Sequence, residues 1–451
     1  MTATQRCQVV VVGAGLSGLR CADRLRSSGL KVRVIEARDR VGGRTLSRRI
    51  GTGTFDLGGQ WLGPSQDRVA ALARELDVHT FPTFHHGRRV LDHEGRLSTY
   101  DGTIPKMAPW VLLDVDQALR RMSRRLKDVD VDQPLRTPDG AALDGQSLET
   151  WARSTMFTSS ARAVFASAMR IVFGFETSDI SALHTLVYAR AAGGLMPLFD
   201  IENGAQQDRF VEGAQSLSLR LADRLEGPVC LDSPVTSIEH RASGVTVRST
   251  HHTFEADAVV LALPPALCGR ISFSPMLPSA RESLHQRFAM GATVKCMAFY
   301  ERPFWRERGY SGEVVCTDGP VSVIFDNTSQ DGGTACLLSF VVGNDARRWS
   351  SRSIDERRAL ILAQSARAFG PDSLKPVDYV EHDWCTEPFS VGCPTGALGP
   401  GGWSAVGDAL RSNIGRIFFA GTETATVWTG FLEGALQAGD RAAEEVRAAL
   451  A

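Results

Sequence analysis

The hydrophobic pattern is clearest at the start of the chain. Four valines, Val9 to Val12, form a short apolar run bounded by glycine, which is typical of a strand buried on both faces of a parallel sheet. Apolar residues then recur at helical spacing over 16–25, and Gly29 suits a helix C-cap. A second strand pattern over 31–36 ends on Glu36. These residues predict a βαβ unit.

Strand and helix patterns alternate through the rest of the chain. Helical periodicity is found at 112–129, 161–174 and 179–194, whereas 286–384 is rich in strand patterns. Near the C-terminus, a buried strand pattern at 417–420 precedes a polar turn and an amphipathic helix. The alternation predicts an α/β fold without internal repeats.

Three glycines follow the first strand in the spacing GxGxxG. Gly13 suits the tight turn, Gly15 lets a pyrophosphate approach the backbone, and Gly18 lets helix and strand pack closely. Glu36 is placed to hydrogen-bond ribose hydroxyls, and its charge would repel a 2′-phosphate. The unit therefore predicts a dinucleotide site and argues against NADP.

Composition excludes several classes of protein. Fifty basic and fifty-one acidic residues give a net charge of -1, which does not favour nucleic-acid binding. No apolar run approaches the roughly 18 residues of a membrane span, and the amino end lacks signal-peptide features. The nine cysteines contain no CxxC pair, so we expect no metal site and no disulfide framework. We expect a soluble protein of the cytoplasm.

Further motifs carry a resemblance to a known family. "EARDRVGGRT" and "DLGGQWLGPSQ" follow the βαβ unit, "MGATVKCMAFYERPFW" lies in the strand-rich region, and "FAGTETATVWTGFLEGA" lies near the C-terminus. With these motifs the chain resembles the flavin-containing amine oxidase family, which includes monoamine and polyamine oxidases, as a soluble, bacterial-type, monoamine oxidase-like member. The likeness is closest over the first ~80 and last ~70 residues.

The resemblance implies two domains. A discontinuous, Rossmann-like FAD-binding domain would consist of 1–80, 205–285 and 385–451. A mixed α+β substrate-binding domain would consist of 81–204 and 286–384. A homodimer is left open, and no membrane anchor is expected.

The resemblance also implies an extended FAD, with its AMP half on the βαβ unit and its ring system near the C-terminal strand and helix. Val235 corresponds to a residue whose backbone meets the adenine, and Leu432 to one whose N–H faces the flavin at a helix N-terminus. The implied cofactor-binding residues are Gly13, Ala14, Gly15, Ser17, Gly18, Glu36, Ala37, Arg38, Gly43, Arg44, Gly59, Gln60, Trp61, Val235, Trp384, Cys393, Gly421, Thr422, Glu423 and Leu432.

Catalytic roles are implied for Lys295 and Phe431. Alternation along 292–299 puts Lys295 on one face of a strand, where a single lysine would ordinarily extend to water. The matching family lysine hydrogen-bonds through water to flavin N5. The residues implied to bind substrate are Ile171, Tyr188, Phe199, Gln206, Pro394 and Phe431. Asp200 and Glu202 could bind a second cationic group, although a solvated loop is the simpler interpretation.

One cysteine, Cys393, aligns with the residue that carries a thioether to the flavin in mitochondrial monoamine oxidases. Those enzymes have two tyrosines in front of the flavin, where this chain has Pro394 and Phe431. The substitutions predict a wider and more apolar cavity, suited to a bulkier or cyclic amine. Because proline restricts the residue before it, we expect noncovalent FAD, with a thioether through Cys393 as the alternative.

The expected function is FAD-dependent amine oxidation. Hydride equivalents pass from the amine α-carbon to flavin N5, the imine hydrolyses to an aldehyde or ketone, and oxygen is reduced to hydrogen peroxide. The alternatives are an oxidase of an L-amino acid or of a cyclic, nicotine-type amine, a flavin-binding protein without turnover, and an NAD-dependent dehydrogenase.

Overall fold

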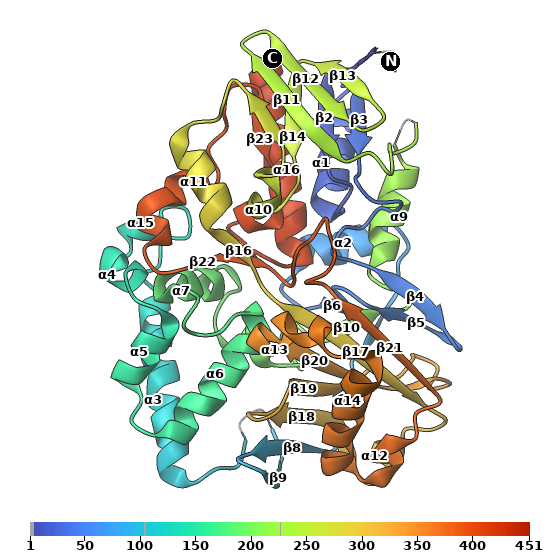
Figure 1. Ribbon diagram of the computed structural model, residues 1–451, viewed down its shortest axis with the longest axis vertical. Coiled ribbons are helices and arrows are strands. Elements are labelled where there is room, and N and C mark those ends of the chain that lie inside the picture. Colours follow the sequence, from blue (N-terminus) through green and yellow to red (C-terminus); the bar gives the residue numbers. More distant parts are fainter. Residues whose placement is uncertain (1–3, 103–104, 226) are drawn as a thin grey trace.

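The computed structural model describes residues 4–102, 105–225 and 227–451. Figure 1 shows the N and C marks at one end of the molecule, a large sheet at the other end, and a group of helices along one side. The large sheet has seven strands. The candidate site lies where these parts meet.

A four-stranded parallel sheet near the termini has the order β23-β14-β2-β3. Its strands are β23 (Ile417–Phe419), β14 (Ala258–Leu261), β2 (Val9–Val12) and β3 (Val32–Ile35). The three sequence segments expected to form the FAD-binding domain each supply strands to this sheet. β2, β14 and β23 are buried throughout, because both faces of the sheet are covered.

Alternate residues of β2 face different layers. Val9 and Val11 pack in a cluster with residues of α1 (Leu16–Ser27) and α16 (Leu432–Leu450), and Figure 1 shows these two helices side by side. Val10 and Val12 pack toward a second sheet of order β1-β13-β12-β11-β15. Its strands are β1 (Thr4–Arg6), β13 (Thr253–Ala256), β12 (Gly244–Ser249), β11 (Val235–Arg241) and β15 (Ser272–Ser274).

The seven-stranded sheet has the order β21-β17-β20-β19-β18-β8-β9. Its strands are β21 (Asp378–Asp383), β17 (Thr293–Tyr300), β20 (Ala335–Val342), β19 (Val321–Asp326), β18 (Tyr310–Cys316), β8 (Arg88–His93) and β9 (Arg96–Tyr100). Val294 and Cys296 pack with residues of α14 (Ile354–Phe369), and Met297 and Phe299 pack on the other face. The two-face pattern predicted for β17 is therefore observed. No strand was predicted at β8 or β9.

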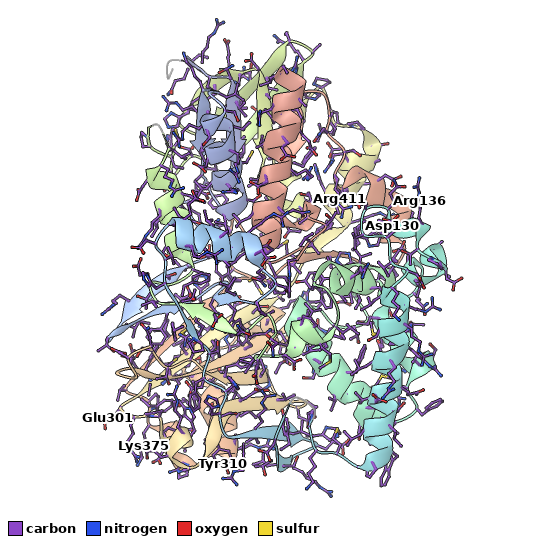
Figure 2. All side chains as sticks on the ribbon, turned by 180° about the vertical axis from the view of Figure 1, so that it is seen from behind. Asp130, Arg136, Glu301, Tyr310, Lys375 and Arg411 are labelled. Atoms are coloured by element: carbon purple, nitrogen blue, oxygen red, sulfur yellow. The ribbon has the colours of Figure 1, made fainter. Side chains whose placement is uncertain are left out.

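The helices beside this sheet share a further core. They are α3 (Pro109–Leu126), α4 (Gly140–Asp144), α5 (Leu148–Thr155), α6 (Ser159–Phe173) and α7 (Ala182–Ala191). Arg411 ties the loop after α3 to the C-terminal segment, because its guanidinium donates to the backbone oxygens of Val131 and Thr424. Asp130, labelled near Arg411 in Figure 2, is one of the carboxylates that act on its guanidinium.

Shorter elements connect these layers. The strands are β4 (Ser47–Ile50), β5 (Gly53–Asp56), β6 (Trp61–Leu62), β7 (Thr80–Pro82), β10 (Asp208–Phe210), β16 (Phe288–Met290) and β22 (Gly396–Leu398). The helices are α2 (Asp67–Glu75), α8 (Met196–Phe199), α9 (Gln215–Asp223), α10 (Pro265–Cys268), α11 (Ser279–Arg287), α12 (Phe304–Glu307), α13 (Gly343–Arg347) and α15 (Gly402–Val406). The exact domain boundaries stay a prediction.

Candidate active site

One elongated cavity runs from the βαβ unit to the seven-stranded sheet. We call the part lined by Ile171, Tyr188, Gln206, Pro394 and Phe431 the amine end. The predicted site residues that line the cavity are Gly13, Gly15, Ser17, Glu36, Ala37, Arg38, Gly43, Arg44, Gly59, Gln60, Trp61, Ile171, Tyr188, Gln206, Val235, Lys295, Trp384, Cys393, Pro394, Gly421, Thr422, Phe431 and Leu432.

Four predicted site residues are absent from the described lining. The backbone N–H of Ala14 donates to Glu36, and Gly18 packs against Gly13. Glu423 does not itself line the cavity but forms an ion pair with the lining residue Arg44. In α8 it is Leu198, rather than the predicted Phe199, that lines the cavity, and Phe199 packs against the helical core.

The glycines of the βαβ unit meet different steric demands. Gly13 has φ of +100°, which a residue with a side chain rarely adopts. A Cβ at Gly18 would lie 2.0 Å from the carbonyl oxygen of Gly13, so α1 can approach this loop only without a side chain there. A Cβ at Gly15 would meet no atom closer than Gly43 Cα at 3.9 Å. Gly15 therefore leaves open space in the cavity.

Glu36 closes the βαβ end of the cavity. Its side chain is buried, with Oε2 accepting from the N–H of Ala14 at 2.7 Å and Oε1 from that of Arg38 at 3.0 Å. Each carboxylate oxygen has a second lone pair. Glu36 can thus accept hydroxyl hydrogen bonds from a ligand in the cavity.

Arg44 joins the C-terminal segment to the loop that contains Cys393. Its Nη1 donates to Glu423 Oε1 at 2.6 Å and to the carbonyl oxygen of Pro394 at 2.9 Å. The Cys393–Pro394 peptide bond is cis. Burial raises the pKa of the Cys393 thiol to about 11, so the thiol is protonated at neutral pH.

Lys295 is buried, with 3% of its surface exposed. Nζ donates to the carbonyl oxygens of Asp56 at 2.9 Å and Gly58 at 2.7 Å, and to Gln60 Oε1. Three acceptors match the three hydrogens of an ammonium group. Burial lowers the pKa of Lys295 below its usual range, and the nearby Asp56 carboxylate opposes that shift. This lysine does not extend to bulk water, unlike the usual solitary lysine on a strand.

Three aromatic rings form a wall beside Lys295. Trp61 stacks on Phe340 with ring centroids 5.9 Å apart and meets Phe325 edge-on at 5.5 Å. Lys295 Nζ lies 5.5 Å from the Trp61 ring and 5.4 Å from the Phe340 ring. Phe325 and Phe340 line the cavity and were not predicted from the sequence. Their strands alternate like many others, and only sheet order brings them here.

The polar side-chain groups at the amine end are the Gln206 amide and the Tyr188 hydroxyl. The Phe431 ring lies 5.8 Å from that of Tyr188. Gln206 donates through Nε2 to the carbonyl oxygen of Leu198, which leaves its buried Oε1 without a partner.

Asp200 and Glu202 line a separate cavity of about 290 Å³, together with His85 and Arg89. Neither carboxylate reaches the lining of the elongated cavity. At the amine end, therefore, neither Asp200 nor Glu202 is in a position to bind a second cationic group of the substrate.

The residues present fit FAD. The open space at Gly15, the acceptors on Glu36 and the N-terminus of α16 beside the lining residue Leu432 suit the pyrophosphate, the ribose and the anionic edge of the flavin, respectively. Within the described residues, no group of three or more His, Cys, Asp or Glu side chains could hold a metal ion. In the same part of the chain, no helix is long and apolar enough to span a bilayer.

Comparison with known proteins identifies the family. The family model for flavin containing amine oxidoreductases matches residues 16–447. AofH of Mycobacterium tuberculosis, provisionally named a flavin-containing monoamine oxidase, is 42% identical over 98% of this chain and 97% of its own length. Amine oxidase [flavin-containing] B of Canis lupus familiaris is 36% identical over 98% of this chain and 86% of its own length.

Comparison with solved structures leads to the same family. Wild-type putrescine oxidase bound to putrescine is 33% identical, has a TM-score of 0.95, and is matched over 99% of this chain and 100% of its own. Cyclohexylamine oxidase from Brevibacterium oxydans IH-35A is 30% identical and has a TM-score of 0.94. The match covers 98% of this chain and 99% of that oxidase. These comparisons confirm the Rossmann-like fold, the FAD cofactor and the oxidation of amines. They exclude the alternative of an NAD-dependent dehydrogenase. The chain belongs to the family of flavin-containing amine oxidases.

Proposed function

We propose that the substrate is an amine with a single nitrogen on a bulky apolar or cyclic group. The observation that carries this proposal is the apolar lining of the amine end, with Ile171 and Phe431, and of the adjoining aromatic wall, with Phe325 and Phe340. Such a lining disfavours an ammonium ion and so lowers the pKa of a bound amine toward the reactive neutral form.

The charged residues of the cavity support the same substrate class. Among the lining residues that the structure describes, Glu36 is the single carboxylate, and it lies at the βαβ end. A second ammonium group of a diamine would therefore be buried without a partner. Of the three lining arginines, Arg44 donates to Glu423 and Pro394, Arg38 is paired with Glu36 and Glu387, and Arg270 donates to the carbonyl oxygen of Pro388. This disfavours an α-carboxylate as well.

FAD, when bound, accepts hydride equivalents from the amine α-carbon and passes the electrons to oxygen, giving hydrogen peroxide. The chain supplies the surroundings for this chemistry. The aromatic wall displaces water from the bound amine, and the side chains of the amine end orient it. Lys295 supplies a fixed positive charge, which its three acceptors hold in place.

Butylamine and putrescine test the substrate class, because they differ only in the second nitrogen. We expect kcat/KM for butylamine to exceed that for putrescine by about 100-fold or more, since the second ammonium loses its hydration without compensation. Cyclohexylamine should be oxidised better than either, and L-leucine should not be oxidised. Peroxide release from the purified enzyme measures all four. A preference for putrescine would contradict the substrate class while leaving amine oxidation intact.

We expect noncovalent FAD because the Cys393 thiol is protonated at neutral pH. The thiolate is the nucleophilic form, and a pKa near 11 leaves only about one thiol in 10⁴ ionised at pH 7. Acid precipitation should give a white pellet under a yellow supernatant, and Cys393→Ala should behave identically. A yellow pellet from the wild-type protein that turns white in Cys393→Ala would establish the thioether instead.

The remaining sequence-based expectations stay predictions. The described cysteines are all free, which suits the reducing cytoplasm. Cell fractionation tests that location. Light scattering of the purified protein tests the homodimer, and limited proteolysis tests the domain boundaries.

A further inference from the structure

A short chain of hydrogen bonds runs behind the Lys295 ammonium group. Lys295 Nζ donates to Gln60 Oε1, and Gln60 Nε2 donates to Asn327 Oδ1 at 3.0 Å. Asn327 Nδ2 lies 4.0 Å from Met297 Sδ. Gln60 is 2% exposed and Asn327 is 1% exposed, so water does not compete for these groups. Asn327 does not line the cavity.

The orientation of both amides follows from the lysine. An ammonium group donates only, so Gln60 must turn its oxygen toward Lys295 and its NH₂ away. The group that meets this NH₂ must then accept, and Asn327 does so through Oδ1. If Asn327 offered no oxygen, the Gln60 NH₂ would be buried without a partner, and the Gln60 side chain would gain by rotating.

The backbone at Asn327 is held independently of its side chain. Its N–H donates to the carbonyl oxygen of Cys336 at 2.8 Å. The preceding carboxylate, Asp326, accepts two hydrogen bonds from Arg306 and one from the N–H of Thr328. A change of the Asn327 side chain therefore leaves the anchors of the turn in place.

Several titratable or charged groups face Lys295 from the elements around it. They are Asp56 at the end of β5, Arg209 on β10, Cys336 on β20, His382 on β21 and Cys393 in the loop before β22. None of them bonds to the Gln60 amide in the described structure. The Asn327 side chain also lies beside Met297 Sδ and hydrogen-bonds the Cys336 thiol, but Gln60 is the one described group that joins its amide directly to the Lys295 ammonium.

We infer that Asn327 is a positioning residue, which locks the Gln60 amide with its oxygen toward Lys295 and so keeps that lysine charged and in place. This role goes beyond the proposed substrate class and does not depend on it. Burial already lowers the pKa of Lys295, so the loss of one acceptor matters more here than at an exposed lysine.

Titration of Lys295 by NMR tests the role directly. The chain has five lysines, and Lys31, Lys106, Lys127 and Lys375 are exposed. In protein labelled with ε-¹³C lysine, Lys295 should give one shifted signal, which is absent from Lys295→Arg. In Asn327→Leu, we expect its titration midpoint to fall by about one pH unit, because a hydrogen bond to the charged form is lost.

Asn327→Asp provides the rescue, because it keeps an oxygen for the Gln60 NH₂. In this variant the titration midpoint of Lys295 should stay within about 0.3 pH unit of the wild-type value or move upward, because any added negative charge favours the ammonium form of Lys295. Asn344→Leu, the same change at an exposed asparagine, should leave the midpoint unchanged. If Asn327→Leu does not fold, Asn327→Ala replaces it. An unchanged midpoint in the oxygen-free variant, or an equal fall in Asn327→Asp, overturns the inference.

Discussion

The Gly15→Ala variant is expected to fold normally and to lose most of its affinity for FAD. Gly15 lies in extended backbone with φ of -71° and ψ of 171°, which alanine adopts readily. Its new Cβ would have no protein atom within 3.4 Å and would point into the open cavity. Overpacking of one methyl group costs about 1–3 kcal/mol, so we expect the Kd for FAD to rise by about 5- to 150-fold. Fluorescence titration of the cofactor-free protein measures this.

Gly18→Ala, three residues away, separates cofactor binding from folding. Its Cβ would lie 2.0 Å from the carbonyl oxygen of Gly13 and 3.0 Å from Ala262 Cβ, so α1 would have to move away from its sheet. We expect this variant to lose about 3 kcal/mol or more of unfolding free energy. In the absence of FAD, the Tm of Gly15→Ala should stay near that of the wild type. Equal losses of Tm in both variants would contradict a cofactor-specific role for Gly15.

Features set by neighbouring residues in the chain were predictable from the sequence. The βαβ unit was recognised because the turn, the helix and the terminal Glu36 follow one another within thirty residues. The same holds for the face of β17 that carries Lys295, since strand alternation needs no knowledge of the partner strands. Local spacing therefore predicted the βαβ part of the cofactor half, and the family resemblance implied its other residues.

Features set by tertiary pairing were not predictable. Phe340 lies directly opposite Lys295 in the β17–β20 pairing, but no spacing in the sequence reveals which strands are neighbours. In α8, a shift of one residue turns a side chain by about 100°, which is why Leu198 rather than Phe199 reaches the cavity. Asn327 acts across 267 residues of sequence from Gln60. The aromatic wall, the face that α8 turns to the cavity and the contact of Asn327 with Gln60 therefore required the structure.

The Lys295→Met variant is expected to keep its reaction with the amine but to lose most of its reaction with oxygen. Oxygen gains negative charge as it takes electrons, and Lys295 is a buried cation with a fixed position in the cavity. The loss of one such preorganised group typically slows a step by about 10²- to 10³-fold. The amine becomes neutral before it reacts, so anaerobic reduction by the amine should change by less than about 10-fold. Stopped-flow absorbance measures the two half-reactions separately.

Two measurements separate this electrostatic role from a structural one. Methionine leaves Gln60 Oε1 and the carbonyl oxygens of Asp56 and Gly58 without a donor, which costs about 1–3 kcal/mol for each group that finds no other partner. The Tm of Lys295→Met will therefore fall, and the amine half-reaction shows whether the cavity is still intact. Lys375→Met, the same change at an exposed lysine, should affect neither half-reaction. An equal slowing of both half-reactions in Lys295→Met would mean that the cavity had collapsed, and an unchanged oxygen reaction would show that the charge of Lys295 has no part in it.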